Sequence, residues 1–247
     1  MALVILQHGP TAGAMRLGAT LRDYGHRLRV IELNAGEPVP RNLDDTDGII
    51  STGGPMSANA ESPWIEAELE LLARADEASL PVIGLCLGSQ VLARALGGQV
   101  APMEGGIELG WHEVTLTPVG AEDPLHAGIA WTSMQFHWHS DHVSVAPEGA
   151  RVLAKSAGCP IQAWARGLRT YGFQYHPEVY ADTVETWAAE HPEDLVQAGV
   201  TLDDLRAQTR THFDVFERLS RRLFESIALL LMPSDRRYQG LVKDLHH

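Results

Sequence analysis

Residues 81–96 read PVIGLCLGSQVLARAL, and this stretch indicates how the N-terminal half of the chain folds. Residues 81–84 are apolar and predict a short buried strand. Residues 89–96 carry apolar side chains at helical spacing, and two glycines that follow predict the end of this helix. A buried strand that turns within a few residues into a helix is typical of a parallel sheet with covering helices.

The same alternation of short apolar runs and amphipathic stretches continues on the N-terminal side. The pattern predicts strands over residues 2–7, 28–33 and 48–51, and helices over residues 12–24 and 63–77. Continuously apolar strands separated by helices indicate a mostly parallel sheet with helices on both faces.

The sequence pattern changes on the C-terminal side. Further strands, joined by turns that contain Gly and Pro, are predicted over residues 108–117, 134–138, 151–156, 161–165 and 170–175. We expect these strands to form an antiparallel portion of the sheet. Residues 201–232 then show an almost continuous helical pattern. The chain is therefore divided into one α/β domain over residues 1–180 and a helical extension over residues 181–247 packed on the same domain.

Composition excludes several classes of function. The chain has 247 residues with 19 Lys and Arg against 32 Asp and Glu, a formal net charge of −13. Nucleic-acid binding needs a basic face, and anionic membranes repel a chain of this charge, so neither partner is expected. Two cysteines are too few for a disulfide framework or a Cys-based zinc site. The apolar run at residues 2–7 is too short for a signal peptide, and we expect a cytoplasmic protein.

The segment Gly84-Leu85-Cys86-Leu87-Gly88 joins the predicted strand to the predicted helix. Glycines two residues before and two residues after Cys86 suit a sharp, strained strand-to-helix turn that exposes a nucleophile. The N-terminus of the helix would also favour a thiolate. The alternative interpretation is a buried cysteine in a glycine-rich turn, because a free cysteine is often part of a core.

The segment His176-Pro177-Glu178 follows the last predicted strand. Pro177 holds His176 out of helical conformation, and Glu178 is close enough in sequence to orient the imidazole and stabilise its cation. His176 is thus a candidate general base, although an ordinary loop histidine would show the same local pattern.

A third segment, STGGPMS at residues 51–57, follows the third predicted strand. Together with the Cys86 turn and His176-Pro177-Glu178, it resembles the class I glutamine amidotransferase family over residues 3–179. The resemblance implies a flavodoxin-like three-layer α/β sandwich. It also implies that Cys86 is the nucleophile, His176 the general base and then acid, and Glu178 its orienting partner.

The resemblance assigns further roles by position. The backbone N–H groups of Gly54 and Leu87 would form the oxyanion hole. The residues that would bind the amino-acid end of the substrate are Gln90, His139, Ser140 and Asp141. The implied reaction is cleavage of the γ-amide of glutamine through a thioester on Cys86, without a cofactor.

Several alternatives remain open at this point. The stand-alone chain resembles the glutaminase half of GMP synthase, which would need a synthetase partner subunit to accept ammonia. A freestanding γ-glutamyl peptidase or hydrolase, acting on γ-glutamyl amides or peptides, would use the same residues. A binding module without catalysis, and a homodimer, are further alternatives.

One competing motif points to metal chemistry. Residues 137–142 read HWHSDH, which resembles the zinc-binding signature of metallo-β-lactamase-like hydrolases, with His137, His139, Asp141 and His142 as the ligands. That interpretation leaves the Cys86 turn, the Gly-Gly-Pro segment and His176-Pro177-Glu178 unexplained, so no metal site is expected. His8-Gly9-Pro10 ends the first predicted strand and is interpreted as a plain turn, with a place at the active-site edge as the alternative.

Overall fold

The computed structural model describes residues 1–232, and within them the chain is built on a nine-stranded mixed sheet. In spatial order the strands are β2 (Leu28–Glu32), β1 (Ala2–Gln7), β3 (Thr46–Ser51), β4 (Val82–Leu85), β11 (Thr170–Phe173), β10 (Ala163–Arg166), β9 (Ala150–Lys155), β6 (Glu108–Leu116) and β7 (Thr132–His139). The first five strands pair in parallel, and each later pairing is antiparallel. The predicted α/β fold with a parallel core and an antiparallel portion is confirmed.

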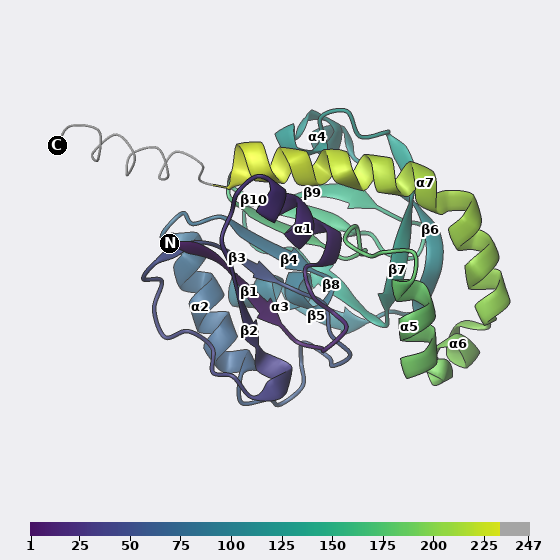
Figure 1. The fold of residues 1–247 in the computed structure, drawn as a ribbon, viewed down its shortest axis with the longest axis horizontal. Helices are drawn as coiled ribbons and strands as arrows, with labels where there is room; N and C mark the ends of the chain where they lie inside the picture. Colours follow the sequence, from purple (N-terminus) through teal and green to yellow (C-terminus); the bar gives the residue numbers. More distant parts are fainter. Residues whose placement is uncertain (233–247) are drawn as a thin grey trace.

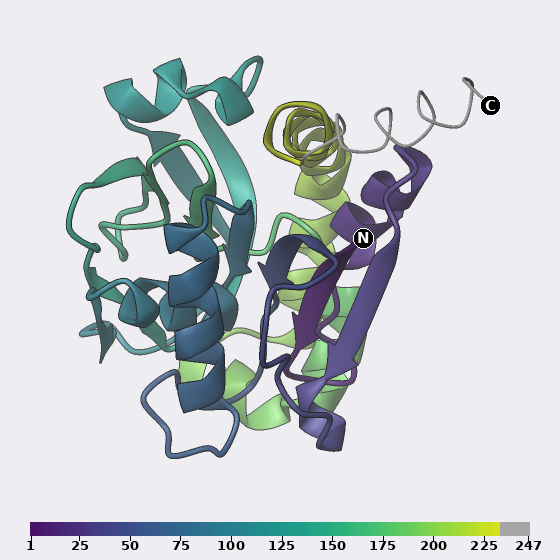
Figure 2. The ribbon, with the colours of Figure 1, turned by 90° about the vertical axis from the view of Figure 1, so that its left-hand side faces the viewer.

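Helices cover both faces of the parallel core because alternate side chains of each buried strand point to opposite faces. Leu3 and Ile5 pack in one apolar cluster with α1 (Met15–Asp23) and α7 (Leu202–Ser226). Val4 and Leu6 pack in another cluster with α2 (Ile65–Glu77) and α3 (Leu87–Ala95). Figure 1 shows α7 as a long helix beside α1, and Figure 2 shows α2 on a different side of the molecule from α7.

The long helix α7 is held against α1 by one buried cation, Arg16. Thr201 caps it, and the side chains and backbone of Thr201 and Asp204 form a reciprocal capping box. Arg16 of α1 donates to Ser220 Oγ at 2.9 Å and to the Glu217 carbonyl at 2.8 Å, and its guanidinium lies 5.5–5.7 Å from three phenylalanine rings of α7. The helix ends in a π-helical segment, Ile227–Leu231. The helical pattern predicted for residues 201–232 is therefore correct.

A separate two-stranded sheet was not predicted. It pairs β5 (Gln99–Pro102) with β8 (Asp141–Val145), both short and only partly buried, so neither segment shows a clear apolar alternation. The remaining elements are α4 (Pro118–Glu122), α5 (Thr183–Glu190), α6 (Pro192–Ala198) and two short 3₁₀ turns at Leu33–Ala35 and Pro124–His126. The domain boundary at residue 180 stays a prediction, and residues 233–247 of the predicted extension lie outside the described residues.

Among the described residues, no helix combines the length and the apolar character that crossing a membrane requires.

Candidate active site

Cys86 lies at a sharp turn between β4 and α3. Its backbone has φ 49° and ψ −108°, a conformation that side chains rarely adopt, and its N–H donates to the Phe173 carbonyl at 2.7 Å. A Cβ atom added to Gly88 would lie 2.0 Å from the Ser51 carbonyl oxygen, and one added to Gly84 would lie 2.5 Å from the Gly88 carbonyl oxygen. Both glycines are thus required by backbone-to-backbone contact, which explains the spacing around Cys86.

His176 is brought beside Cys86 by the pairing of β11 with β4. Phe173 of β11 lies opposite Leu85 of β4, so the residues that follow the two strands emerge at the same edge of the sheet. His176 interacts with Cys86 through its side chain, and its Nδ1 lies 2.8 Å from Glu178 Oε1. The ring of Trp187 packs edge-on against the imidazole at 4.9 Å. The three residues that the sequence singled out as a triad therefore lie together.

The electrostatics of His176 favour the imidazolium form. Burial by itself would lower the pKa of His176, but the negative charges of Cys86 and then Glu178, with a hydrogen bond to each, raise it to about 10. At neutral pH His176 is therefore an imidazolium, with Glu178 2.8 Å from its Nδ1.

Residues 52–55, which follow β3, pack against the turn at Cys86. Gly88 N–H donates to the Thr52 carbonyl at 3.0 Å, which fixes this segment against the first turn of α3. A Cβ atom on Gly53 would lie 3.0 Å from the His176 ring, and one on Gly54 would lie 2.7 Å from His8 Cβ. Leu87 is the first residue of α3, where an N–H has no acceptor within the helix. Gly54 and Leu87 thus flank the nucleophile, as an oxyanion hole requires.

The four residues expected to bind substrate line the same cavity as Cys86 and His176. The Asp141 carbonyl accepts hydrogen bonds from Gln90 Nε2 at 2.8 Å and from His139 Nδ1 at 3.0 Å. The Asp141 carboxylate accepts from Ser57 Oγ at 2.5 Å, and Ser140 is exposed. The hydrogen bonds therefore hold the segment 139–141 between α3 and the loop after β3.

The cavity has a volume of about 610 Å³ and extends away from Cys86 to a wall that the sequence did not predict. This wall, which we call the α5–α6 wall, consists of Trp187, Glu190, His191, Glu193, Asp194 and Gln197. Asp194 accepts a hydrogen bond from the Trp138 indole at 2.7 Å, which links the wall to β7. Lys and Arg are absent from the described residues that line the cavity. No motif marked these residues, because they contribute single side chains from two short helices.

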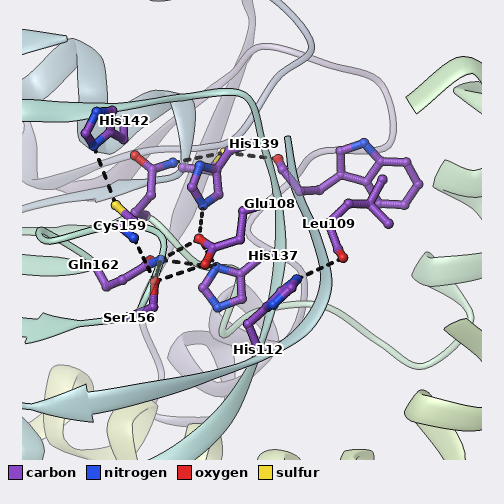
Figure 3. A network of polar contacts seen from close by, with 12 residues as sticks. Glu108, Leu109, His112, His137, His139, His142, Ser156, Cys159 and Gln162 are labelled. Carbon is purple, nitrogen blue, oxygen red and sulfur yellow. Dashed lines mark hydrogen bonds and ion pairs between the residues drawn. The ribbon is translucent and has the colours of Figure 1, made fainter. Parts of the chain in front are cut away.

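Beside the cavity, Glu108 lies between two histidines (Figure 3). Its Oε2 is 3.0 Å from His139 Nε2, 3.2 Å from His137 Nδ1 and 2.7 Å from Gln162 Nε2. Burial lowers the pKa of His137 to about 4, and the two histidines hold the pKa of Glu108 well below its usual range against the effect of burial. Among the described residues, Glu108, His137 and His139 are the group whose donor atoms lie close enough to share an ion.

The four ligands of the competing metal motif do not converge on one point. Asp141 turns to Ser57, and His142 Nδ1 lies 3.8 Å from Cys159 Sγ. His137 and His139 face Glu108 instead, which lies outside the motif. The side chains of the motif therefore contact three different residues, namely Ser57, Cys159 and Glu108.

The segment after β1 is more than the plain turn that the sequence suggested. Gly9 and Pro10 line the cavity, and His8 is buried against Glu68 of α2, with His8 Nε2 2.8 Å from Glu68 Oε2.

Comparisons with known proteins identify a matching family and several relatives of this chain. Residues 15–188 match the family described as glutamine amidotransferase class-I. The chain is 36% identical over 181 residues to the glutamine amidotransferase-like protein YfeJ of Salmonella typhimurium, covering 71% of this chain and 75% of that protein. It is 36% identical over 162 residues to one subunit of the glutamine-hydrolyzing GMP synthase of Archaeoglobus fulgidus, covering 65% of this chain and 80% of that one.

Solved structures show the same fold over most of the chain. A glutamine amidotransferase from Methylobacillus flagellatus superposes with a TM-score of 0.80 at 29% identity and covers 91% of this chain and 93% of its own. A glutamine amidotransferase from Thermotoga maritima superposes with a TM-score of 0.82 at 24% identity, which supports the fold alone, and covers 93% and 98%.

Proposed function

Because this chain belongs to the class I glutamine amidotransferase family, we propose that it hydrolyses the side-chain amide of glutamine through a thioester on Cys86. The observation that carries the proposal is the contact of Cys86 with His176, whose Nδ1 lies 2.8 Å from Glu178, at the edge of a cavity of about 610 Å³. This arrangement supplies a nucleophile, a proton carrier and a carboxylate that stabilises the cation.

In the first half of the reaction, the Cys86 thiolate attacks the carbonyl carbon of the glutamine amide. A C–S bond forms, and the carbonyl π electrons move onto oxygen, where the N–H groups of Gly54 and Leu87 would stabilise them. His176 gives its proton to the amide nitrogen, the C–N bond breaks, and ammonia leaves. The product on the protein is a γ-glutamyl thioester.

In the second half, His176 is neutral and takes a proton from water. The oxygen of that water attacks the thioester, the C–S bond breaks, and the sulfur leaves as a thiolate. Glutamate is released and the ion pair of Cys86 and His176 is restored. The carboxylic acid formed gives its proton to ammonia in solution, so the sum is glutamine plus water giving glutamate plus ammonium.

The test is the release of ammonia and glutamate from L-glutamine by the purified protein. Cys86→Ala is the negative control and Cys159→Ala is the matched control for loss of a buried thiol. Turnover by the wild type and by Cys159→Ala, but not by Cys86→Ala, is expected. Equal turnover by wild type and Cys86→Ala would contradict the proposal.

A synthetase partner is the second part of the proposal. Two of the relatives at 35–36% identity are named as subunits of a glutamine-hydrolyzing GMP synthase. A glutaminase subunit of this kind passes ammonia to another chain, so glutamine turnover should rise when the partner is present. Measuring turnover with and without proteins that co-purify with the chain from its native cells tests this. Turnover that no co-purified protein changes would oppose it.

The α5–α6 wall favours a second candidate, a freestanding hydrolase of γ-glutamyl amides. Glu190, Glu193 and Asp194 line the cavity beyond the catalytic pair, and no Lys or Arg among the described lining residues balances them. Such a wall suits a γ-glutamyl compound whose leaving group carries a positive charge.

A substrate panel tests this second candidate. We compare kcat/KM for glutamine, for γ-glutamyl amides of diamines and for neutral γ-glutamyl amides of the same length. Selective loss of the diamine substrates in Glu193→Gln, with glutamine unchanged, would support it. Equal kcat/KM for charged and neutral leaving groups would reject it.

A further inference from the structure

His8 and Glu68 form a buried ion pair that the catalytic proposal does not use. His8 follows β1 and Glu68 lies on α2, and both side chains are fully buried at 0% exposure. His8 Nε2 lies 2.8 Å from Glu68 Oε2, and the other carboxylate oxygen of Glu68 accepts from Ser51 Oγ at 2.7 Å. A buried ion pair is expensive in desolvation, so its position in the fold calls for a physical reason.

The second nitrogen of His8 faces the backbone of the loop at residues 52–55. His8 Nδ1 lies 3.0 Å from the Thr52 carbonyl oxygen. Both ring nitrogens thus face oxygen atoms, an arrangement in which a doubly protonated ring can donate to both. Burial lowers the pKa of His8, but the charge of Glu68 and the hydrogen bonds raise it overall.

These contacts fix the position of the loop that carries the Gly54 N–H. His8 Nδ1 holds the Thr52 carbonyl, and Gly54 packs against His8, where an added Cβ atom would lie 2.7 Å from His8 Cβ. On its other side the loop faces the catalytic pair, because a Cβ atom on Gly53 would lie 3.0 Å from His176 Cε1 and 3.8 Å from Cys86 Cβ.

We propose that His8, held by Glu68, is a positioning residue that keeps the loop with the Gly54 N–H in place for the oxyanion. The Thr52 carbonyl also accepts a hydrogen bond from the Gly88 N–H at 3.0 Å. The loop is therefore held both by His8 and by the first turn of α3. The ring of Trp64 packs on His8 at 4.7 Å and fixes its plane. This inference rests on the proposed reaction, in which Gly54 supplies an oxyanion donor.

The test compares two reactions of the same sulfur. Acylation of Cys86 by p-nitrophenyl acetate passes through a tetrahedral oxyanion, whereas alkylation by iodoacetamide does not. Both rates are measured for wild type, His8→Asn and Glu68→Gln in a Cys159→Ala background, so that Cys86 is the reacting thiol. His8→Asn keeps an N–H near the position of Nδ1 but loses the charge. Tyr171→Phe, which removes a buried hydroxyl 3.3 Å from Asp123, is the matched control.

We expect acylation to fall about tenfold or more in His8→Asn and Glu68→Gln, while alkylation stays within about twofold of wild type. On glutamine, kcat should fall with little change in KM, and His8→Asn should retain more activity than His8→Ala. Tyr171→Phe should lower thermal stability without changing the ratio of acylation to alkylation.

An unchanged ratio of acylation to alkylation in His8→Asn and Glu68→Gln would overturn the inference. Parallel loss of both rates would also overturn it, because a general structural defect has that effect. Failure of the proposed function is a separate result, since it would show as a wild type that acylates but turns over no γ-glutamyl substrate.

Discussion

The two cysteines of this chain each lie near a histidine, yet their surroundings differ. Cys86 follows a parallel strand, begins a helix and interacts with His176. Cys159 lies in the loop between β9 and β10, where its sulfur is 3.8 Å from His142 Nδ1 and 3.5 Å from the Ile161 carbonyl oxygen. Burial raises the pKa of the Cys159 thiol to about 12, so this cysteine is an uncharged part of the core.

The histidines beside these two cysteines, His142 and His176, differ in the direction of their pKa shifts. Burial and then the neighbouring His139 lower the pKa of His142, whereas the charges of Cys86 and Glu178 raise that of His176. His176 has a carboxylate 2.8 Å from its far nitrogen, and His142 shows no such contact among the described residues. A cysteine near a histidine is therefore insufficient to make the histidine cationic, and the pKa of His176 is raised by two neighbouring groups, Cys86 and Glu178.

The largest difference in kcat between the two cysteines is expected when each sulfur is removed in turn. Cys86→Ala should lower kcat for the γ-glutamyl substrate by about 10⁴-fold or more, because no other group forms the thioester. Cys159→Ala should change kcat by less than about twofold and lower the free energy of unfolding, because it leaves a small cavity. Steady-state kinetics and thermal unfolding of the two variants measure this. Comparable losses of kcat in both would remove the distinction between the cysteines.

The backbone turn at Cys86 can be broken without touching the sulfur. Gly88→Ala places a Cβ atom 2.0 Å from the Ser51 carbonyl oxygen, so we expect a loss of about 3 kcal/mol or more in the free energy of unfolding. Gly105→Ala is the control, because nothing lies within 4 Å of its added Cβ and it should be nearly neutral. Denaturant unfolding of both proteins decides the matter, and equal stabilities would show that the turn tolerates a side chain.

The charge on His176 should be visible in the alkylation rate of Cys86. Because the pKa of His176 is raised to about 10, its cation is present at pH 7 and is lost as the pH rises through that value. His176→Gln removes the cation, so alkylation by iodoacetamide at pH 7 should fall about 10- to 30-fold, and the deficit should shrink at higher pH. A pH profile of the rate from 6 to 10 tests this. A variant whose profile overlays that of wild type would show that His176 does not stabilise the thiolate.

The smallest effect is expected from metal removal. Glu108 Oε2 already lies within 3.2 Å of nitrogens of His139, His137 and Gln162, so this carboxylate oxygen has partners without an ion. Incubation with EDTA should leave both kcat and the melting temperature unchanged. Metal analysis of protein purified without added zinc complements this test. Near-stoichiometric zinc that disappears in Glu108→Gln would instead identify these histidines as ligands.

Local patterns predicted much of the fold and the elements of the triad. The strands β1 and β6 and the helix α2 each lie within about two residues of their predicted bounds, because apolar periodicity reflects the face that each element buries. The pair β5 and β8 escaped prediction because each strand is short and partly exposed. The helix α3 begins at Leu87, two residues before its predicted start, because the turn at Cys86 leads into it directly.

Side-chain pairs between residues far apart in the sequence could not be predicted from local patterns. His8 and Glu68 are 60 residues apart and meet because α2 packs over the end of β1. Glu108 meets His139 because β6 and β7 pair in a register that places these two residues opposite each other. The α5–α6 wall likewise consists of single residues that only packing brings to the cavity.

Local sequence was enough to establish the parallel α/β class, the glycine-flanked turn at Cys86 and the pairing of His176 with Glu178. These features depend on backbone conformation and on residues a few positions apart, which sequence encodes directly. The folded chain was needed to establish which cysteine lies beside a cationic histidine, which histidines face a carboxylate and what lines the cavity. Those outcomes depend on strand register and helix packing between segments far apart in the chain, and these set the burial and the charged neighbours of each group.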